Sequence, residues 1–213
     1  MSFIITKNRK CIKIFMEDKR IIKTKQNLKR TMIQLLSRVP FEKVTVCELC
    51  RTGMTSRITF YTHYDDKYAL VEDMFRDYID EAVRDYHRLQ AENNPSHTAL
   101  QGYYNMLDCI LNLYYNNLAF FSRTSPERNP YLYSAFYHHI FCNVDEYIRR
   151  HSRQMAAKYP SRQTAALLCN GLWGVINECY ASGTSRTDMR RDIRSMFHDI
   201  LVSPLFHQNG GSY

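Results

Sequence analysis

Glycine and proline are scarce in this chain of 213 residues, which contains seven glycines and six prolines. Because both residues interrupt helices, and because long stretches have helical periodicity, their scarcity favours an all-α fold. No apolar run approaches the ~20 residues that a membrane-spanning helix needs. Residues 1–15 contain four basic residues and lack the apolar core of a secretory signal. We therefore predict a cytoplasmic protein that does not contact a membrane.

The sequence also lacks the motifs of common enzymes: no G-x-S-x-G elbow, P-loop or H-E-x-x-H motif occurs. The seven cysteines are scattered, as is typical of reduced thiols. Cys47 and Cys50 form an isolated C-x-x-C, and Cys50 is interpreted as a small core residue. His138 and His139 are adjacent, so in a helix they do not face one ion. We predict no enzyme, cofactor or metal; a helical enzyme using the Tyr- and His-rich middle is the least supported alternative.

Positive charge is concentrated in the first third of the chain. Of the 29 Lys and Arg residues and the 21 Asp and Glu residues, 15 and six respectively fall in residues 1–67. This segment therefore carries a charge of +9 and the remainder a charge of −1. A small basic module suits a polyanion, because Lys and Arg release counterions from a phosphate backbone. A solvated charged surface is the alternative interpretation.

The N-terminal third predicts three helices. The first, over 23–38, has a stripe of apolar residues at three- and four-residue spacing and ends before Pro40. Thr45 caps a short helix that ends at Gly53, with Glu48 completing a capping box. Ser56 caps another short helix, from Arg57 to Tyr64. Two short helices joined by a tight turn after a longer one are typical of a helix-turn-helix.

The remaining sequence predicts further helices over 67–93, 99–123, 131–158 with one break, 163–182 and 187–202. A loop with two prolines separates the second and third of these segments, and the Gly-rich end from His207 is expected to fray. We divide the chain into a basic extension (1–20), a helix-turn-helix domain (21–66), a larger helical regulatory and dimerisation domain (67–204) and a flexible tail (205–213). Whether residues 1–15 belong to the native chain stays open.

The second short helix carries the side chains expected to meet DNA. Arg57 lies at its start, where a guanidinium reaches the O6 and N7 atoms of guanine. Thr59, Tyr61 and His63 suit contacts with phosphates, which fix register without reading sequence. The predicted DNA-binding set is Thr45, Ser56, Arg57, Ile58, Thr59, Tyr61, His63 and Lys67. Phe60 and Tyr64 are expected to pack inward.

This segment resembles the DNA-binding domain of the TetR/AcrR family of bacterial regulators, over residues 23–75. The matching positions are Thr45-Val46, Leu49-Cys50, Ser56, Thr59-Phe60-Tyr61, His63-Tyr64 and Lys67. The turn departs from the family pattern at Gly53, where Ala is usual, at Met54, where Gly is common, and at Thr55, where an aliphatic residue is usual. A buried Thr55 hydroxyl would need a hydrogen-bond partner.

The C-terminal two-thirds resembles the family in length and helix count. The resemblance implies a homodimer built from the last two long helices, and middle helices that enclose an effector pocket. The candidate pocket residues are Tyr103, Met106, Leu107, Ile110, Tyr114, Tyr137, Phe141 and Trp173. Their aromatic and apolar character suits a small apolar or aromatic effector, and a plain hydrophobic core is the equal alternative.

Together these features predict a dimeric regulator that binds double-stranded DNA at a near-palindromic operator, in the family's usual mode as a repressor. An effector that changes the spacing of the two recognition helices would release the operator. The alternative is a diverged family member that acts mainly through protein–protein contacts, without a small-molecule inducer. The departures at Met54 and Thr55 motivate that alternative.

Overall fold

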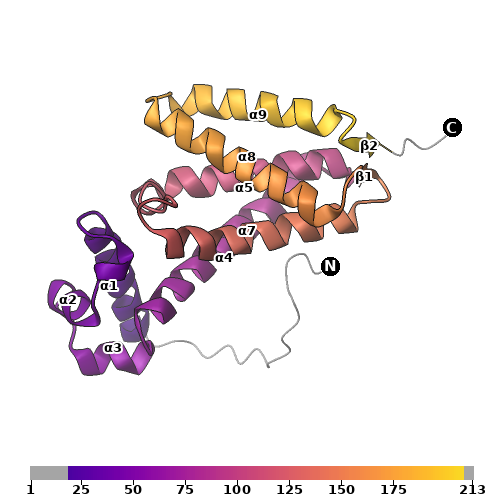
Figure 1. Ribbon diagram of the computed structural model, residues 1–213. Coiled ribbons are helices and arrows are strands. Elements are labelled where there is room, and N and C mark those ends of the chain that lie inside the picture. Colours follow the sequence, from indigo (N-terminus) through magenta and orange to yellow (C-terminus); the bar gives the residue numbers. More distant parts are fainter. Residues whose placement is uncertain (1–18, 209–213) are drawn as a thin grey trace. The chain divides into compact units, whose positions relative to one another are not determined.

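The computed structural model describes residues 19–208, in which the chain is predominantly helical (Figure 1). Most of the predicted basic extension, and residues 209–213 of the predicted tail, lie outside the described residues. The elements are α1 (Lys19–Leu36), the 3-10 helix η1 (Phe41–Lys43), α2 (Val46–Thr52), α3 (Arg57–His63), α4 (Lys67–Asn93), α5 (Ala99–Asn116), α6 (Leu118–Phe121), α7 (Pro130–Arg150), β1 (Met155–Ala157), α8 (Ser161–Ala181), α9 (Arg186–Val202) and β2 (Phe206–Gln208).

The chain forms two compact units. The N-terminal unit contains the described residues up to 81 together with 116–135, and the C-terminal unit contains 82–115 and 136 onward. Helices α4 and α7 each contribute to both units. None of the helices within residues 19–208 is sufficiently long and apolar to span a membrane.

The core of the N-terminal unit forms around α1. The predicted apolar stripe of this helix is buried, at Leu28, Met32, Leu35 and Leu36. Phe41 stacks on Tyr131 with ring centroids 5.3 Å apart. The Phe41 main-chain N–H donates to Oδ1 of the fully buried Asn129 at 2.6 Å, which satisfies a donor that burial would otherwise leave unpaired. Apolar packing and a buried amide thus attach the loop after α1 to the start of α7.

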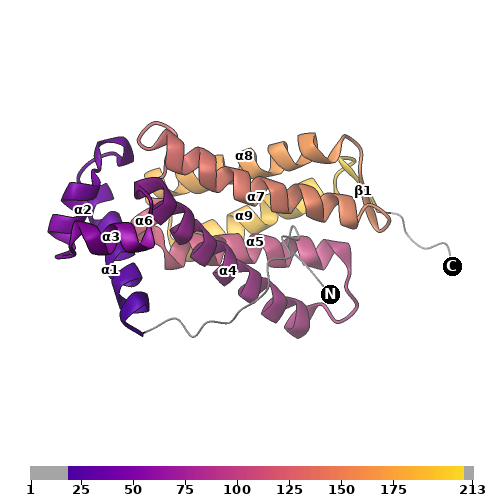
Figure 2. The same cartoon turned by 90° about the horizontal axis from the view of Figure 1, so that it is seen from below.

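The C-terminal unit is a bundle in which the long helices α5, α7, α8 and α9 run broadly along one another (Figures 1 and 2). Helix α5 is buried along most of its length, and its Tyr103 ring lies 4.7 Å from the ring of Tyr147 on α7. Ser185 begins α9 by accepting a hydrogen bond from the Asp188 N–H at 3.1 Å. Aromatic packing and helix capping together define this bundle.

Two local features differ from the sequence predictions. The helix predicted over 99–123 is interrupted at Asn117, where the backbone leaves the helical region before α6. Helix α7 ends at Arg150, and β1 pairs antiparallel with β2, so that Ala157 lies opposite Phe206. Phe206 is buried against the ring of Tyr103. This packing converts part of the predicted tail into a strand.

Candidate nucleic-acid interface

Helices α2 and α3 form the predicted helix-turn-helix, and both begin at the predicted caps. The Thr45 hydroxyl accepts from the Glu48 N–H at 3.2 Å, and the Ser56 hydroxyl accepts from the Thr59 N–H at 3.0 Å. Each cap satisfies a main-chain donor that the first helical turn leaves free. These bonds make two helices of only seven residues well defined at their starts.

The inner face of α3 is anchored in the core, as predicted. Phe60 is completely buried and Tyr64, at the end of the helix, is nearly so. The Tyr64 hydroxyl donates to an Asp73 carboxylate oxygen at 2.8 Å, and the Lys29 ammonium lies 2.9 Å from the same oxygen. These contacts link α3 to α1 and α4. The orientation of α3 is therefore fixed by burial of Phe60 in its middle and by the part-buried polar cluster around Tyr64 at its C-terminal end.

The opposite face of α3 points to solvent. Arg57 and Tyr61 are exposed, and the Ile58 side chain retains 83% of its accessible surface. The Ser56 and Thr59 hydroxyls lie 2.8 Å apart and bond to each other, while the exposed Thr62 hydroxyl donates to a main-chain carbonyl of its own helix. A cation, a phenol and a branched apolar side chain thus dominate the exposed face.

The turn between α2 and α3 explains two of the three departures from the family pattern. A methyl group at Gly53 would lie 2.9 Å from Oγ1 of Thr31 and 3.1 Å from a main-chain oxygen of Leu49, so an alanine does not fit without a shift. The Asn27 amide donates to the Gly53 carbonyl at 2.6 Å. The Thr55 hydroxyl donates to the same carbonyl at 3.0 Å, which supplies the partner that its partial burial requires.

Met54 remains an unfavourable residue for this turn. Its φ is 46°, in the left-handed region that side chains with a Cβ rarely adopt, and its side chain is 96% exposed. The backbone is held in this conformation on both sides. The Gly53 carbonyl is bonded to the Asn27 amide, and the Ser56 hydroxyl caps α3. No burial of the Met54 side chain offsets the resulting strain.

Lys67 lies where the sequence placed it, but its ammonium is held inside the N-terminal unit. It donates to the main-chain carbonyls of Phe41, Glu42 and Val44 at 2.8 to 2.9 Å. The ammonium also lies 4.6 Å from the centroid of the Phe41 ring. Burial lowers the pKa of Lys67, which the nearby carboxylates partly oppose. We therefore assign Lys67 to the support of the loop before α2 instead of to a phosphate contact.

An open groove of about 670 Å³ lies between the start of α1 and the turn before α3. One wall carries the side chains of Lys19, Arg20 and Lys23, and the other carries Ser56 and Thr59. The sequence prediction placed Lys19 and Arg20 in a basic extension and Lys23 in the first helix, and it included none of the three among the DNA-binding residues, whereas α1 begins at Lys19. The run of basic residues was the available signal. This groove extends the cationic surface beside the exposed face of α3.

Solved structures match the chain over most of its length. A protein from Syntrophomonas wolfei described as a TetR-family transcriptional regulator aligns with a TM-score of 0.69 at 9% identity, covering 86% of this chain and 97% of its own. A TetR-family regulator from Shewanella has a TM-score of 0.60 at 20% identity, with coverage of 87% and 99%. One from Streptococcus agalactiae has a TM-score of 0.56 at 19% identity, with coverage of 85% and 97%.

This chain has the TetR-family fold. The sequence prediction of this fold is therefore confirmed, including its N-terminal helix-turn-helix. No protein-family model and no curated protein matches the sequence. At 9–20% identity the likeness concerns the backbone arrangement alone.

The predicted effector-pocket residues all lie in the C-terminal unit. They come from three helices: Tyr103, Met106, Leu107, Ile110 and Tyr114 from α5, Tyr137 and Phe141 from α7, and Trp173 from α8. Tyr114 and Trp173 meet edge to face at 6.2 Å, and Tyr137 accepts from the Asn170 amide at 2.8 Å. The Tyr103 hydroxyl is buried and has no hydrogen-bond partner within the described part of the chain.

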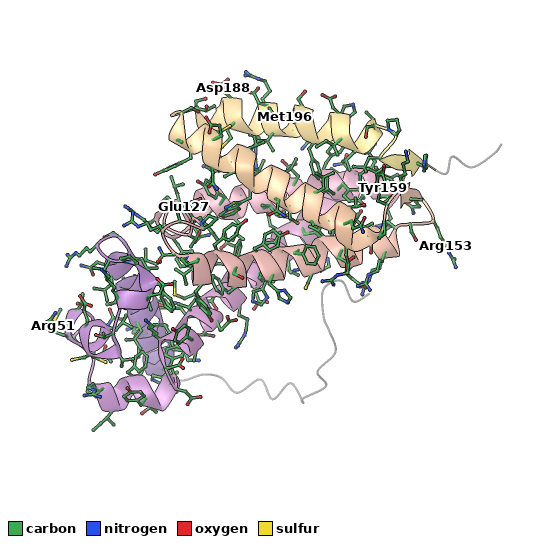
Figure 3. All side chains as sticks on the ribbon, in the orientation of Figure 1. Arg51, Glu127, Arg153, Tyr159, Asp188 and Met196 are labelled. Carbon is green, nitrogen blue, oxygen red and sulfur yellow. The ribbon has the colours of Figure 1, made fainter. Side chains whose placement is uncertain are left out.

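Helices α8 and α9 lie side by side (Figure 1). Both helices expose large apolar side chains. About half or more of the surface of Leu167 and Tyr180 on α8, and of Met196 and Val202 on α9, is accessible. Met196 is labelled on α9 in Figure 3. A Cβ added at Gly171 or at Gly174 would have no atom within 4 Å, so one side of α8 is open along a stripe that includes Leu167.

Proposed function

We propose that the chain is a DNA-binding transcriptional regulator of the TetR type, which represses transcription by binding a near-palindromic operator. The observation that carries this proposal is the two-sided α3 helix, with Phe60 buried and Arg57 and Tyr61 exposed. A recognition helix needs this division, because one face must be fixed to the domain while the other enters the major groove. The basic groove beside α3 supplies positive charge for the phosphates on either side.

The exposed side chains divide into two roles on duplex DNA. Arg57 lies in the first turn of α3, where its guanidinium donates to the O6 and N7 atoms of a guanine. Tyr61 and the half-exposed His63 lie four and six residues further along α3 and suit phosphate oxygens. Thr45, Ser56 and Thr59 act indirectly in this proposal, because the Thr45 and Ser56 hydroxyls cap α2 and α3 and the Thr59 hydroxyl bonds to that of Ser56.

The DNA-binding proposal is tested by selecting bound sequences from a random duplex library and measuring affinity for the selected operator. We expect the double variant Arg57→Ala, Tyr61→Ala to lose about a hundredfold or more in affinity, because each lost contact costs about 1–3 kcal/mol. Arg153→Ala, an exposed arginine of the C-terminal unit labelled in Figure 3, is the matched control. Failure to select any sequence, or equal affinity of the double variant and the control, would contradict the proposal.

The proposed assembly is a homodimer through α8 and α9. Solvent-exposed Leu167, Tyr180, Met196 and Val202 support it, because large apolar side chains gathered on two adjacent helices mark an interaction surface. A second copy of the same surface is the simplest partner, since two-fold contacts are the commonest in soluble oligomers. Two copies of α3 related in this way would match an operator made of two similar half-sites.

We also propose a small apolar or aromatic effector for the C-terminal unit. The buried Tyr103 hydroxyl supports it, because an unpaired buried donor is costly and a ligand with an acceptor would satisfy it. Screening aromatic carbonyl compounds for release of operator DNA tests this role. Tyr103→Phe should bind operator normally and respond more weakly to an active compound. An unchanged response in that variant would remove Tyr103 from the effector site.

A further inference from the structure

Met54, in the turn before α3, and Ile58, within α3, are the most exposed large apolar residues of the described chain. Met54 is 96% exposed and Ile58 is 83% exposed, whereas other exposed large apolar side chains between residues 19 and 208 reach at most 58%. A fully buried isoleucine is favoured by about 1.5–3 kcal/mol over an exposed one. A folded domain that leaves such a residue in water therefore forgoes stability at that position. Ile58 follows Arg57 as the second residue of α3, in the turn that faces base edges in a helix-turn-helix.

The hydrogen-bonding groups around Ile58 are largely committed within the protein. The Ser56 and Thr59 hydroxyls bond to each other, and the Ser56 hydroxyl also caps α3 by accepting from the Thr59 N–H. The Thr62 hydroxyl donates to the Ile58 carbonyl at 2.9 Å. The protein surface at Ile58 is therefore apolar. It lies between the Arg57 guanidinium and hydroxyl groups that are already hydrogen-bonded within the protein.

The major groove presents one apolar feature, the C5 methyl group of thymine. We propose that Ile58 contacts a thymine C5 methyl in each operator half-site, next to the base pair that Arg57 reads. This specificity role rests on the proposed function. The β-branched side chain of Ile58 is nearly restricted to one rotamer in a helix, so little conformational freedom is lost when its methyl groups meet the base. Cytosine at the same position offers no methyl group, so this contact favours A·T over G·C there.

Replacement of thymine by deoxyuridine tests the contact, because it removes the methyl group and keeps the base-pairing edge. In the selected operator, each thymine is replaced in turn and the dissociation constant is measured with the full-length protein. We expect one thymine position in each half-site to be sensitive. A single replacement at such a position should weaken binding about fourfold, as the loss of one buried methyl group predicts. Ile58→Ala should bind the unmodified operator more weakly and should be insensitive to deoxyuridine at that position.

Met54→Ala is the matched control, since it shortens the neighbouring exposed apolar side chain outside α3. It should retain the full deoxyuridine effect. Because Ile58 is exposed, Ile58→Ala should have the same melting temperature as the parent chain. Tight operator binding that is indifferent to every deoxyuridine replacement, or an Ile58→Ala variant that keeps the sensitivity, would overturn the role of Ile58 alone. Absence of binding to any selected DNA would overturn the proposed function and this role together.

Discussion

The two helical units both expose large apolar side chains, but in different electrostatic surroundings. In the N-terminal unit, Ile58 lies next to the exposed Arg57 and near a groove lined by basic residues. In the C-terminal unit, Leu167 is exposed on α8, and the neighbouring α9 pairs its charges, as Arg191 does with Asp188 at 2.8 Å. Apolar exposure alone therefore does not identify a partner. Positively charged surroundings favour a polyanion as the binding partner, and balanced charges favour another protein surface.

The largest effect is expected at Leu167, in the C-terminal unit. Leu167→Glu places a charge on the exposed stripe of α8 and should convert the dimer to monomers, measured by sedimentation velocity. Operator affinity should then fall about a hundredfold, because the two DNA-binding domains are no longer linked and each binds its half-site separately. Leu118→Glu, an exposed position on α6, should leave both properties unchanged. A dimeric Leu167→Glu variant would contradict the proposed interface.

The next effect concerns stability of the N-terminal unit. Lys67→Met removes the ammonium that donates to three carbonyls and should lower the free energy of unfolding by about 2–3 kcal/mol. Urea unfolding followed by circular dichroism measures this loss. Lys43→Met, at an exposed position of η1, should change it by less than about 0.5 kcal/mol. If the two variants were equally stable, Lys67 would have no supporting role.

A pH-dependent effect of about 1 kcal/mol is expected at Asp73. Burial alone would raise the pKa of this carboxyl group, but hydrogen bonds from Lys29 and Tyr64 and the charges of Lys29 and Lys25 outweigh it and lower the pKa. The carboxylate therefore contributes stability above the unfolded pKa of about 3.9, and this contribution is lost as pH falls through the lower folded pKa. Asp73→Asn should flatten that part of the stability curve below about pH 4. If the stability of Asp73→Asn depended on pH below about pH 4 as that of the parent chain does, Asp73 would not be the source of this dependence.

The smallest effect is expected at Met54, in the N-terminal unit, where a substitution should be stabilising. Met54→Gly should stabilise the N-terminal unit by about 1 kcal/mol, because glycine adopts the φ of 46° without strain and the exposed Met54 side chain gives up no packing. The melting temperature should rise by a few degrees. A lower melting temperature would show that the methionine stabilises the turn in a way that its exposure does not explain.

The helix-turn-helix was predictable from the sequence because its determinants are local. Thr45 and Ser56 precede short helices whose first N–H groups they cap, and the spacing of Phe60 and Tyr64 separates a buried face from an exposed one. Helix caps and apolar periodicity act over three or four residues, so a linear sequence contains them. The same reasoning placed Arg57 and Ile58 on the outer face.

The contacts that the sequence did not predict join distant segments. Asn27 reaches the Gly53 carbonyl across 26 positions, and Lys67 reaches the Phe41 carbonyl across the same separation. The pairing of β1 with β2 likewise depends on burial of Phe206 against Tyr103. No local pattern specifies these partners, because each is chosen by tertiary packing. The roles proposed for the DNA-binding and effector residues remain predictions for the same reason.

The most direct test of the central claim is the salt dependence of binding to the selected operator. The capped α3 and its basic surroundings predict tight binding near 50 mM salt and a fall in affinity of about a thousandfold or more by about 200 mM, as the release of six or more counterions requires. The double variant Arg57→Ala, Tyr61→Ala should bind selected and random duplexes with similar weak affinity. Absence of binding at low salt, or an affinity that does not change with salt, would contradict the account.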